Sequence, residues 1–222
     1  MIPKISELFD MEHTIAADLF EGKEYPWEVL GDIKEYILKL GPTLPADEFD
    51  NPSEGIWIAK DAKVYPTAYI GAPCIIDHGA EVRHCAFIRE SAIVGKNSVV
   101  GNSCEVKNAV IFDNCEVPHY NYVGDSVLGF HAHMGAGSVT SNVKSDRKNV
   151  VVKSDDEQME TGRRKFGAML GDWCEIGCNA VLNPGSVVGR NATVYPTTCS
   201  RGVVPANSIK KNDGRIVEKR TE

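Results

Sequence analysis

The stretch from Ile88 to Val106 reads IRESAIVGKNSVVGNSCEV and places an aliphatic residue at every sixth position. The same step of six continues in both directions along the chain. It gives the apolar positions Ile58, Val64, Ile70, Ile76, Val82, Ile88, Val94, Val100, Val106 and Phe112. A period of six fits neither an α-helix, with 3.6 residues per turn, nor a half-buried strand, with a period of two. A fixed period of this kind is typical of stacked structural repeats that bury a shared core.

A coil with three short, flat sides explains the spacing. Each side directs one aliphatic side chain inward, and a turn that favours Gly or Asn follows, as in Ile70-Gly71 and Val100-Gly101. Successive coils would stack at about 4.8 Å, the spacing of neighbouring strands. The phase slips by one residue at Val123, Leu128 and Met134, and it resumes at Leu170, Ile176, Leu182, Val188 and Val194. We therefore predict an all-β parallel β-helix of hexapeptide repeats over residues 51–205.

Three segments lie outside this pattern. Residues 1–50 show apolar residues at helical spacing and hold 4 Lys/Arg against 12 Asp/Glu, a net charge of −8. We expect them to form a helical cap, packed on the end of the β-helix or on a neighbouring subunit. Residues 144–166 break the period and are expected to leave the coil as a loop, a common place for function. Residues 206–222 are expected to be a C-terminal tail.

The composition of the 222-residue chain is that of a soluble globular protein, with 42% hydrophobic residues and a net charge of −7. The negative charge argues against a general nucleic-acid binder. No apolar run approaches the ~20 residues of a membrane span, and the N-terminus lacks the apolar core of a signal peptide. We expect a cytoplasmic protein that does not bind membranes.

The cysteines follow no metal-binding pattern. They are Cys74, Cys85, Cys104, Cys115, Cys174, Cys178 and Cys199. Cys174 and Cys178 are four residues apart, but no second pair completes a zinc site. We expect reduced, mostly packed thiols.

Two cations mark a possible anion site. Arg89 and Lys107 are 18 residues apart, which is one coil, and each directly follows an inward residue. We expect them to face outward on the same ladder, where their mutual repulsion requires a nearby anion. Glu105 supplies part of that charge. A bound phosphate bridging the two cations is the functional interpretation, and solvated charges on an outer face are the alternative.

Histidines and glycines suggest further candidates. His119 lies where the phase slips, and a slip changes the direction of nearby side chains. His131 and His133 are two apart, so they would share a strand face, either as half a metal site or as two exposed residues. Gly135-Ala136-Gly137 permits close backbone approach and N–H groups aimed at an oxyanion.

Three runs carry a resemblance to a known family: GNSCEVKN at 101–108, HYNYVGD at 119–125 and MGAGSVTSN at 134–142. They resemble the acetyltransferase domain of bifunctional glucosamine-1-phosphate acetyltransferases/uridylyltransferases. A fourth run, TGRRKFGA at 161–168, is closer to archaeal sugar-1-phosphate nucleotidylyltransferase/acetyltransferases. The resemblance covers residues 56–205. It implies a left-handed β-helix, a homotrimer with active sites between subunits, and acetyl transfer from acetyl-CoA to the amine of an amino-sugar 1-phosphate.

The resemblance also implies roles for individual residues. Arg89 and Lys107, with Glu105 beside them, match the residues that hold the sugar phosphate. His119 matches the general base, Tyr122 a substrate contact, and Asn142 an asparagine beside the amine and acetyl group. Ala136 matches the N–H donor to the oxyanion, and Lys148, with Arg147 as the alternative, matches a lysine that reaches the substrate. Arg163, Arg164, Lys165 and Arg201 are candidates for the phosphates of CoA. No metal is required by this chemistry.

The sequence also departs from the family. An asparagine near the substrate is His133 here, a tyrosine is Val143, and a serine on the acetyl-CoA side is Cys178. Sugar and acyl preference are therefore open, including glucosamine against galactosamine. The nucleotidyltransferase domain has no counterpart, since residues 1–50 hold no Gly-rich nucleotide-binding start. We expect no pyrophosphorylase activity.

Two other interpretations remain. The chain could be a non-catalytic trimer that docks on a separate nucleotidyltransferase through its acidic segment. It also resembles trimeric zinc hydratases of the gamma carbonic-anhydrase type near Ile56-Trp57-Ile58. With His84 and His119 as two ligands, however, the third ligand position is Gly124, so that zinc site lacks a ligand.

Overall fold

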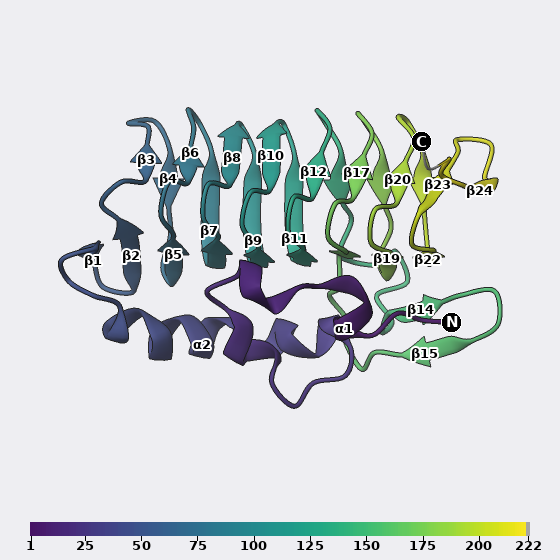
Figure 1. Cartoon of the computed structure of the whole chain (residues 1–222), viewed down its shortest axis with the longest axis horizontal. Helices are drawn as coiled ribbons and strands as arrows, with labels where there is room; N and C mark the ends of the chain where they lie inside the picture. The colour runs from purple at the N-terminus through teal and green to yellow at the C-terminus, as the bar shows by residue number, and fades with distance from the viewer. Residues whose placement is uncertain (221–222) are drawn as a thin grey trace.

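The computed structural model describes residues 1–220, and its strands wind into one long solenoid of stacked coils (Figure 1). One side of the solenoid is a nine-stranded sheet, which we call the nine-stranded face. Its strands, in spatial order, are β24 (Ile216–Glu218), β23 (Ser208–Lys210), β20 (Thr193–Val194), β17 (Glu175–Ile176), β12 (His133–Met134), β10 (Glu116–His119), β8 (Val99–Asn102), β6 (Glu81–Val82) and β3 (Lys63–Val64).

The other two sides belong to one thirteen-stranded sheet, because three long strands continue around a corner. Those strands are β7 (Phe87–Val94), β9 (Glu105–Ile111) and β11 (Tyr122–Leu128). The remaining strands are β1 (Phe49–Ser53), β2 (Ile56–Ala59), β4 (Tyr69–Ile70), β5 (Cys74–Ile76), β13 (Val139–Thr140), β16 (Ala168–Leu170), β18 (Val181–Leu182), β19 (Ser186–Val188), β21 (Cys199–Ser200) and β22 (Val203–Val204). Nearly all pairings between coils are parallel. The predicted left-handed parallel β-helix is confirmed.

The hexapeptide rows form the core of the solenoid. Ile88, Val106 and Val123 lie in register on neighbouring strands, and all three are fully buried. In the first coil the row is less covered, and Val64 is 36% exposed because no coil precedes it. Burial of one aliphatic side chain per side and coil is the main source of stability, since apolar area removed from water contributes about 25 cal/mol per Å².

The prediction that Phe112 points inward is wrong. Val94, Ile111 and Leu128 are in register, so Ile111 occupies the inward row. The step from Val106 to Ile111 is five residues long, one fewer than the step from Ile88 to Val94 on the neighbouring strand, and its corner residue is Asn108, with a left-handed φ of 48°. Phe112 instead packs against Phe9 and Phe20, with ring centroids 5.2 and 5.7 Å apart.

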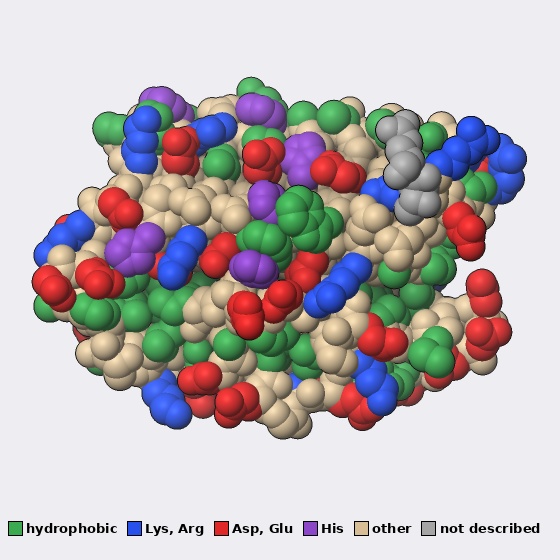
Figure 2. Space-filling model, in the orientation of Figure 1, with side chains coloured by type: hydrophobic (Ala, Val, Ile, Leu, Met, Phe, Trp, Pro, Cys, Tyr) green, Lys and Arg blue, Asp and Glu red, His purple; other side chains and the backbone are tan. Residues whose placement is uncertain are grey.

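The N-terminal segment covers one side of the solenoid, which we call the covered face. The segment contains α1 (Ile5–Leu8), α2 (Ile33–Leu40) and the 3₁₀ helices η1 (Met11–His13), η2 (Ala17–Phe20), η3 (Pro26–Gly31) and η4 (Gly41–Thr43). It lies along the coils of its own chain, with α2 against β7 and β9 and η3 against β11 (Figure 1). This differs from the predicted cap on the end of the β-helix or on a neighbouring subunit. Figure 2 shows many acidic side chains over this part of the surface.

The covering segment explains a feature of the strands beneath it. On an outer strand, alternate side chains should be exposed. Here whole triplets are buried, as in Cys74–Ile76, Ala92–Val94 and Ala168–Leu170. The middle residue of each triplet points away from the solenoid core and is buried by the N-terminal segment.

Two other segments depart from simple coils. Residues 144–166 leave the solenoid and include the antiparallel pair β14 (Val151–Lys153) and β15 (Gln158–Glu160). The solenoid continues beyond residue 205, because β23 pairs in parallel with β20 and then turns back into β24.

In the described part of the chain, no helix is long and apolar enough to cross a membrane.

We predict that Ile93→Ala lowers the free energy of unfolding by about 2–5 kcal/mol, because it leaves a cavity between β7 and the N-terminal segment. Ile93 is fully buried on the covered face. Ile216→Ala is the matched control, since Ile216 is 41% exposed, and it should change stability by less than about 1 kcal/mol. Urea denaturation measures both values. Equal effects of the two variants would contradict the packing described here.

We also predict that Ellman's reagent labels three thiols per native chain, Cys85, Cys178 and Cys199, which are exposed. Burial raises the pKa of the Cys74, Cys104, Cys115 and Cys174 thiols, so they should react only after denaturation. Rapid labelling of more than three thiols in the folded protein would show that the solenoid core is open.

Candidate functional site

The sequence-predicted residues gather on both sides of one edge of the solenoid. This edge separates the nine-stranded face from the side formed by β4, β13, β18, β21 and the first halves of β7, β9 and β11, which we call the cation face. His119 ends β10 on one side of the edge, and Tyr122 begins β11 on the other. The turn between them passes through Tyr120, which has a left-handed φ of 53°. The N-terminal segment lies on the third side, so this edge is left uncovered.

On the cation face, Arg89 and Glu105 form an ion pair, with Arg89 Nη1 2.9 Å from Glu105 Oε1. The predicted ladder of Arg89 over Lys107 is wrong by one residue. The register of β7 and β9 shifts between Ile88 and Glu90, so Glu90 lies opposite Lys107. The extra residue in β7 places Arg89 in a bulge, which redirects its side chain.

Asp125 contacts three other side chains of the cation face. It lies at the corner of β11 with a φ of 49°, and its side chain is only 6% exposed. Its Oδ1 accepts a hydrogen bond from Asn108 Nδ2 at 3.0 Å, and its Oδ2 accepts one from Asn142 Nδ2. Lys107 Nζ lies 3.8 Å from Oδ2, and the Lys107 side chain is 13% exposed. A buried charge pair of this kind holds its partners firmly, because loss of either group leaves the other uncompensated.

The contacts of Asn142 fix the direction of its amide. Its Nδ2 donates to Tyr122 Oη at 3.1 Å and to Asp125. Since a carboxylate only accepts hydrogen bonds, the NH₂ group must face Asp125. Both amide hydrogens are therefore used inside the chain. Within residues 1–220 no group donates to the carbonyl Oδ1, so it can accept a hydrogen bond from an N–H or O–H donor.

Tyr122 is a hydrogen-bond donor at neutral pH. Burial raises the pKa of its phenol above the ordinary value, and the carboxylates of Asp125 and Glu105 raise it further. The hydroxyl therefore keeps its proton while its oxygen accepts from Asn142.

On the nine-stranded face, a shallow pocket of about 390 Å³ opens beside the edge. It is lined by Arg83, Val99, Glu116, Pro118, His119, His133, Gly135, Ala136 and Cys178. Four of these residues were predicted from the sequence: His119, His133, Ala136 and Cys178. His119 is exposed, while His133 is half-buried with its Nδ1 2.8 Å from Glu175 Oε2.

The backbone of the pocket supplies a free N–H. His119, Ala136 and Cys178 occupy equivalent turns of successive coils, as shown by the bonds from Gly137 N to His119 O and from Asn179 N to Ala136 O. Within residues 1–220, the Ala136 N–H donates to no protein group. Gly135 is required next to it, because a Cβ there would lie 2.6 Å from Cys178 N. An unpaired N–H at a pocket wall can stabilise an oxyanion.

The remaining predicted residues lie neither with the cation-face residues nor in the pocket on the nine-stranded face. Lys148 and Arg147 are exposed in the loop. Arg163 Nη2 donates to Glu28 O at 2.8 Å, so this guanidinium ties the loop to η3. Arg164 and Lys165 are exposed near it. Arg201 lines a different pocket of about 530 Å³, together with Ser141, Lys144 and Asn183.

Sequence reasoning missed Asp125, Glu175 and Arg83. Asp125 ends the run HYNYVGD, so its position close to Tyr122 in the sequence could have identified it as a candidate site residue. Glu175 and Arg83 are single charged residues on outer strands, and nothing in the sequence distinguishes them from solvated charges. Among the described residues, no three His, Cys, Asp or Glu side chains are grouped so that they could hold a metal ion.

Comparison with known proteins gives the following matches. The family model for the GMPPB C-terminal domain matches residues 70–158. A bifunctional sugar-1-phosphate nucleotidylyltransferase/acetyltransferase of Sulfurisphaera tokodaii is 39% identical over 94 residues, which is 42% of this chain and 23% of that protein. The bifunctional protein GlmU of Methanocaldococcus jannaschii is 33% identical over 119 residues, which is 53% of this chain and 29% of that protein.

A solved structure of LpxA from Acinetobacter baumannii matches with a TM-score of 0.42 and 11% identity, over 72% of this chain and 70% of that one. The sequence matches cover less than a third of the relatives' own length. Over about half of its length, the chain is thus similar to bifunctional sugar-1-phosphate nucleotidylyltransferase/acetyltransferases and GlmU proteins, which confirms the predicted resemblance.

Proposed function

We propose that this chain is an acetyl-CoA-dependent N-acetyltransferase that acts on an amino-sugar 1-phosphate. The observation that carries the proposal is the fixed amide of Asn142, whose Oδ1 receives no hydrogen bond from residues 1–220 and can accept one from an amine. Arg89 and Lys107 lie on the same face and provide positive charge for a phosphate. Similarity to a protein named as a bifunctional sugar-1-phosphate nucleotidylyltransferase/acetyltransferase supports this assignment.

Binding energy from the phosphate positions the amine. Arg89 uses one Nη1 hydrogen in the pair with Glu105 and has further N–H donors on an exposed guanidinium. Held at the phosphate, the sugar places its amine near Asn142 Oδ1 and Tyr122 Oη. Positioning of this kind converts a bimolecular encounter into an effectively unimolecular step, which lowers the barrier by several kcal/mol.

The chemical step uses the pocket across the edge. The amine nitrogen attacks the thioester carbonyl carbon of acetyl-CoA, so that a C–N bond forms. His119 accepts the proton that leaves the nitrogen. The Ala136 N–H stabilises the oxyanion, a contact typically worth about 3 kcal/mol. The C–S bond then breaks, and the imidazolium returns the proton to the sulfur, which gives the amide and CoA thiol.

The two halves of the site lie on different faces of one chain, so each is open on its outer side. We propose that a second copy in a homotrimer closes the site, with acetyl-CoA bound between the subunits. Light scattering of the purified protein should give three times the 24.3 kDa chain mass.

We predict that the protein releases thiol from acetyl-CoA with glucosamine 1-phosphate or galactosamine 1-phosphate, and that His119→Ala lowers kcat about 10²- to 10⁴-fold. The assay includes the 6-phosphates and UDP-linked amino sugars as alternative acceptors. His84→Ala, an exposed histidine two coils earlier on an equivalent turn, is the matched control. No release with any amine, from a folded trimer, would favour a non-catalytic scaffold.

We predict that Asp125→Asn lowers kcat/KM about 10²-fold. One carboxylate oxygen becomes an NH₂ group, so Asn108 and Asn142 can no longer both donate to this side chain, and Lys107 loses its counter-charge. Asp213→Asn is the control, since Asp213 forms an exposed pair with Arg215 outside the site. Thermal unfolding of both variants separates misfolding from loss of positioning. Unchanged kcat/KM in folded Asp125→Asn would refute the role assigned to Asp125.

A further inference from the structure

The pocket beside the edge holds two imidazoles in different surroundings. Within the described residues, the ring of His119 makes no hydrogen bond to the protein. His133, in contrast, lies between β10 and β17, with Nδ1 2.8 Å from Glu175 Oε2. Its Nε2 is 4.0 Å from Glu116 Oε2, which is beyond hydrogen-bond distance.

The Glu175 contact determines which nitrogen of His133 is available. A carboxylate only accepts hydrogen bonds, so Nδ1 must carry the proton. In the neutral ring Nε2 then holds a lone pair. A base whose second nitrogen is oriented by a carboxylate is the arrangement used for proton transfer in many active sites.

N-acetylation of an amine requires the removal of two protons. At neutral pH an amine with an ordinary α-amino pKa of about 8 is mostly the ammonium ion. One proton must leave before the nitrogen can attack, and a second leaves as the C–N bond forms. A site with two separate proton acceptors meets this requirement.

We propose that His133, oriented by Glu175, accepts the first proton of the substrate ammonium, and that His119 accepts the second. This inference rests on the proposed function and extends it. His133 Nε2 takes the proton from R–NH₃⁺ and releases it to water at the open pocket, where Glu116 is 63% exposed. The free amine then attacks acetyl-CoA as described above. The sum is ammonium plus thioester giving amide, thiol and one proton.

The charged groups around the ring are compatible with this step. Glu116 of β10 and Glu175 of β17 face His133 from the two neighbouring strands. Arg83 lines the same pocket but pairs with Glu81 at 2.9 Å. The remaining titratable groups in the pocket are His119 and Cys178. A purely structural role, as a link between coils, is the alternative for His133.

The test is thiol release measured from pH 6 to 9 with the amine substrate that the wild-type protein accepts. For His133→Asn, only the free-amine fraction reacts. With an amine pKa of about 8, the loss in kcat/KM should be about tenfold at pH 7, twofold at pH 8 and absent at pH 9. His119→Ala, which lacks the second acceptor, should remain impaired at every pH.

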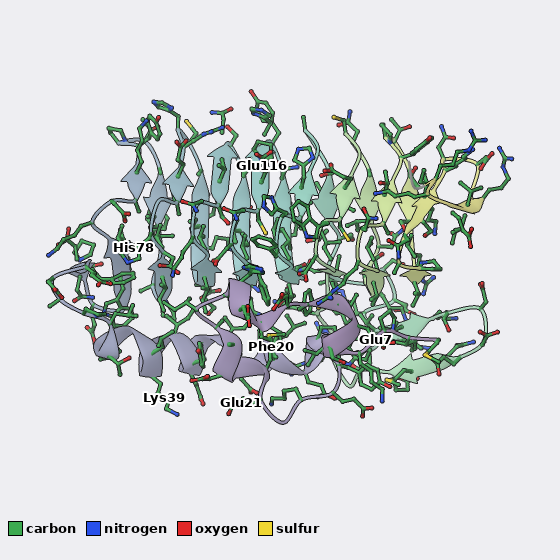
Figure 3. The ribbon with its side chains drawn as sticks, viewed as in Figure 1. Glu7, Phe20, Glu21, Lys39, His78 and Glu116 are labelled. Atoms are coloured by element: carbon green, nitrogen blue, oxygen red, sulfur yellow. The ribbon has the colours of Figure 1, made fainter. Side chains whose placement is uncertain are left out.

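Two further variants sharpen the result. Glu175→Gln keeps a hydrogen-bond acceptor for Nδ1 but removes the charge, so it should show the same rescue at high pH in weaker form. His78→Asn is the matched control, because His78 also holds a carboxylate through Nδ1, Asp61 at 2.9 Å. Figure 3 shows His78 near the first coils, well separated from Glu116 along the solenoid. This control should match the wild-type protein throughout.

The outcomes separate the two proposals. A His133→Asn defect that shrinks with rising pH supports the inference. An equal defect at every pH indicates a structural role and overturns it, as does activity within twofold of wild type at pH 7. If the wild-type protein releases no thiol with any amine, the proposed function fails and this inference fails with it. An active wild-type protein with pH-independent variants overturns only the inference.

Discussion

Backbone hydrogen bonding between successive coils sets the position of every side chain in this protein. Most strands pair with the strand one coil earlier, 16 to 18 residues before it, or 42 residues before it where residues 144–166 leave the solenoid. Residues at these separations therefore become direct neighbours. The aliphatic rows inside depend on this register, and so do the polar rows outside. Without that register, His119, Ala136 and Cys178 would share no pocket, and Asp125 would not reach Asn142.

The N-terminal segment gives the solenoid its asymmetry. By burying the outward residues of one side, it leaves two open sides and a single edge opposite to it. The functional candidates gather at that edge, with the cations and amide on one side and the histidines on the other. Asn108 connects the two regions, because its Nδ2 donates both to Asp125 and to the backbone of Leu30 in η3.

The sequence was sufficient to predict the solenoid, and it named several residues that the structure brings to one edge. A six-residue aliphatic period has few structural explanations, so the fold followed from it. The five-residue step at Asn108 did not, because the loss of one residue at a corner leaves the polarity pattern of the flanking strands unchanged. The bulge at Arg89 was hidden for the same reason, and the predicted ladder of Arg89 and Lys107 was therefore wrong by one.

Contacts between residues far apart in the chain also could not be predicted from the sequence. Apolar triplets such as Ala92–Val94 indicate a side that is buried on both surfaces, but they do not identify what covers it. The hydrogen bond from Arg163 to Glu28 joins residues 135 positions apart, and no local sequence pattern predicts it. The contact of Glu175 with His133 was recognised only in the structure, because the two residues are 42 positions apart.

The N-terminal segment also changes how the solenoid is expected to unfold. Repeat proteins normally make contacts between neighbouring repeats only, so their ends fray independently of the rest. Here Asp10 N donates to Asp172 Oδ2, a contact that spans 162 residues. The first residues of the chain thus contact a coil that is synthesised much later. This high contact order should slow folding and join the coils from β5 to β16 into one cooperative unit.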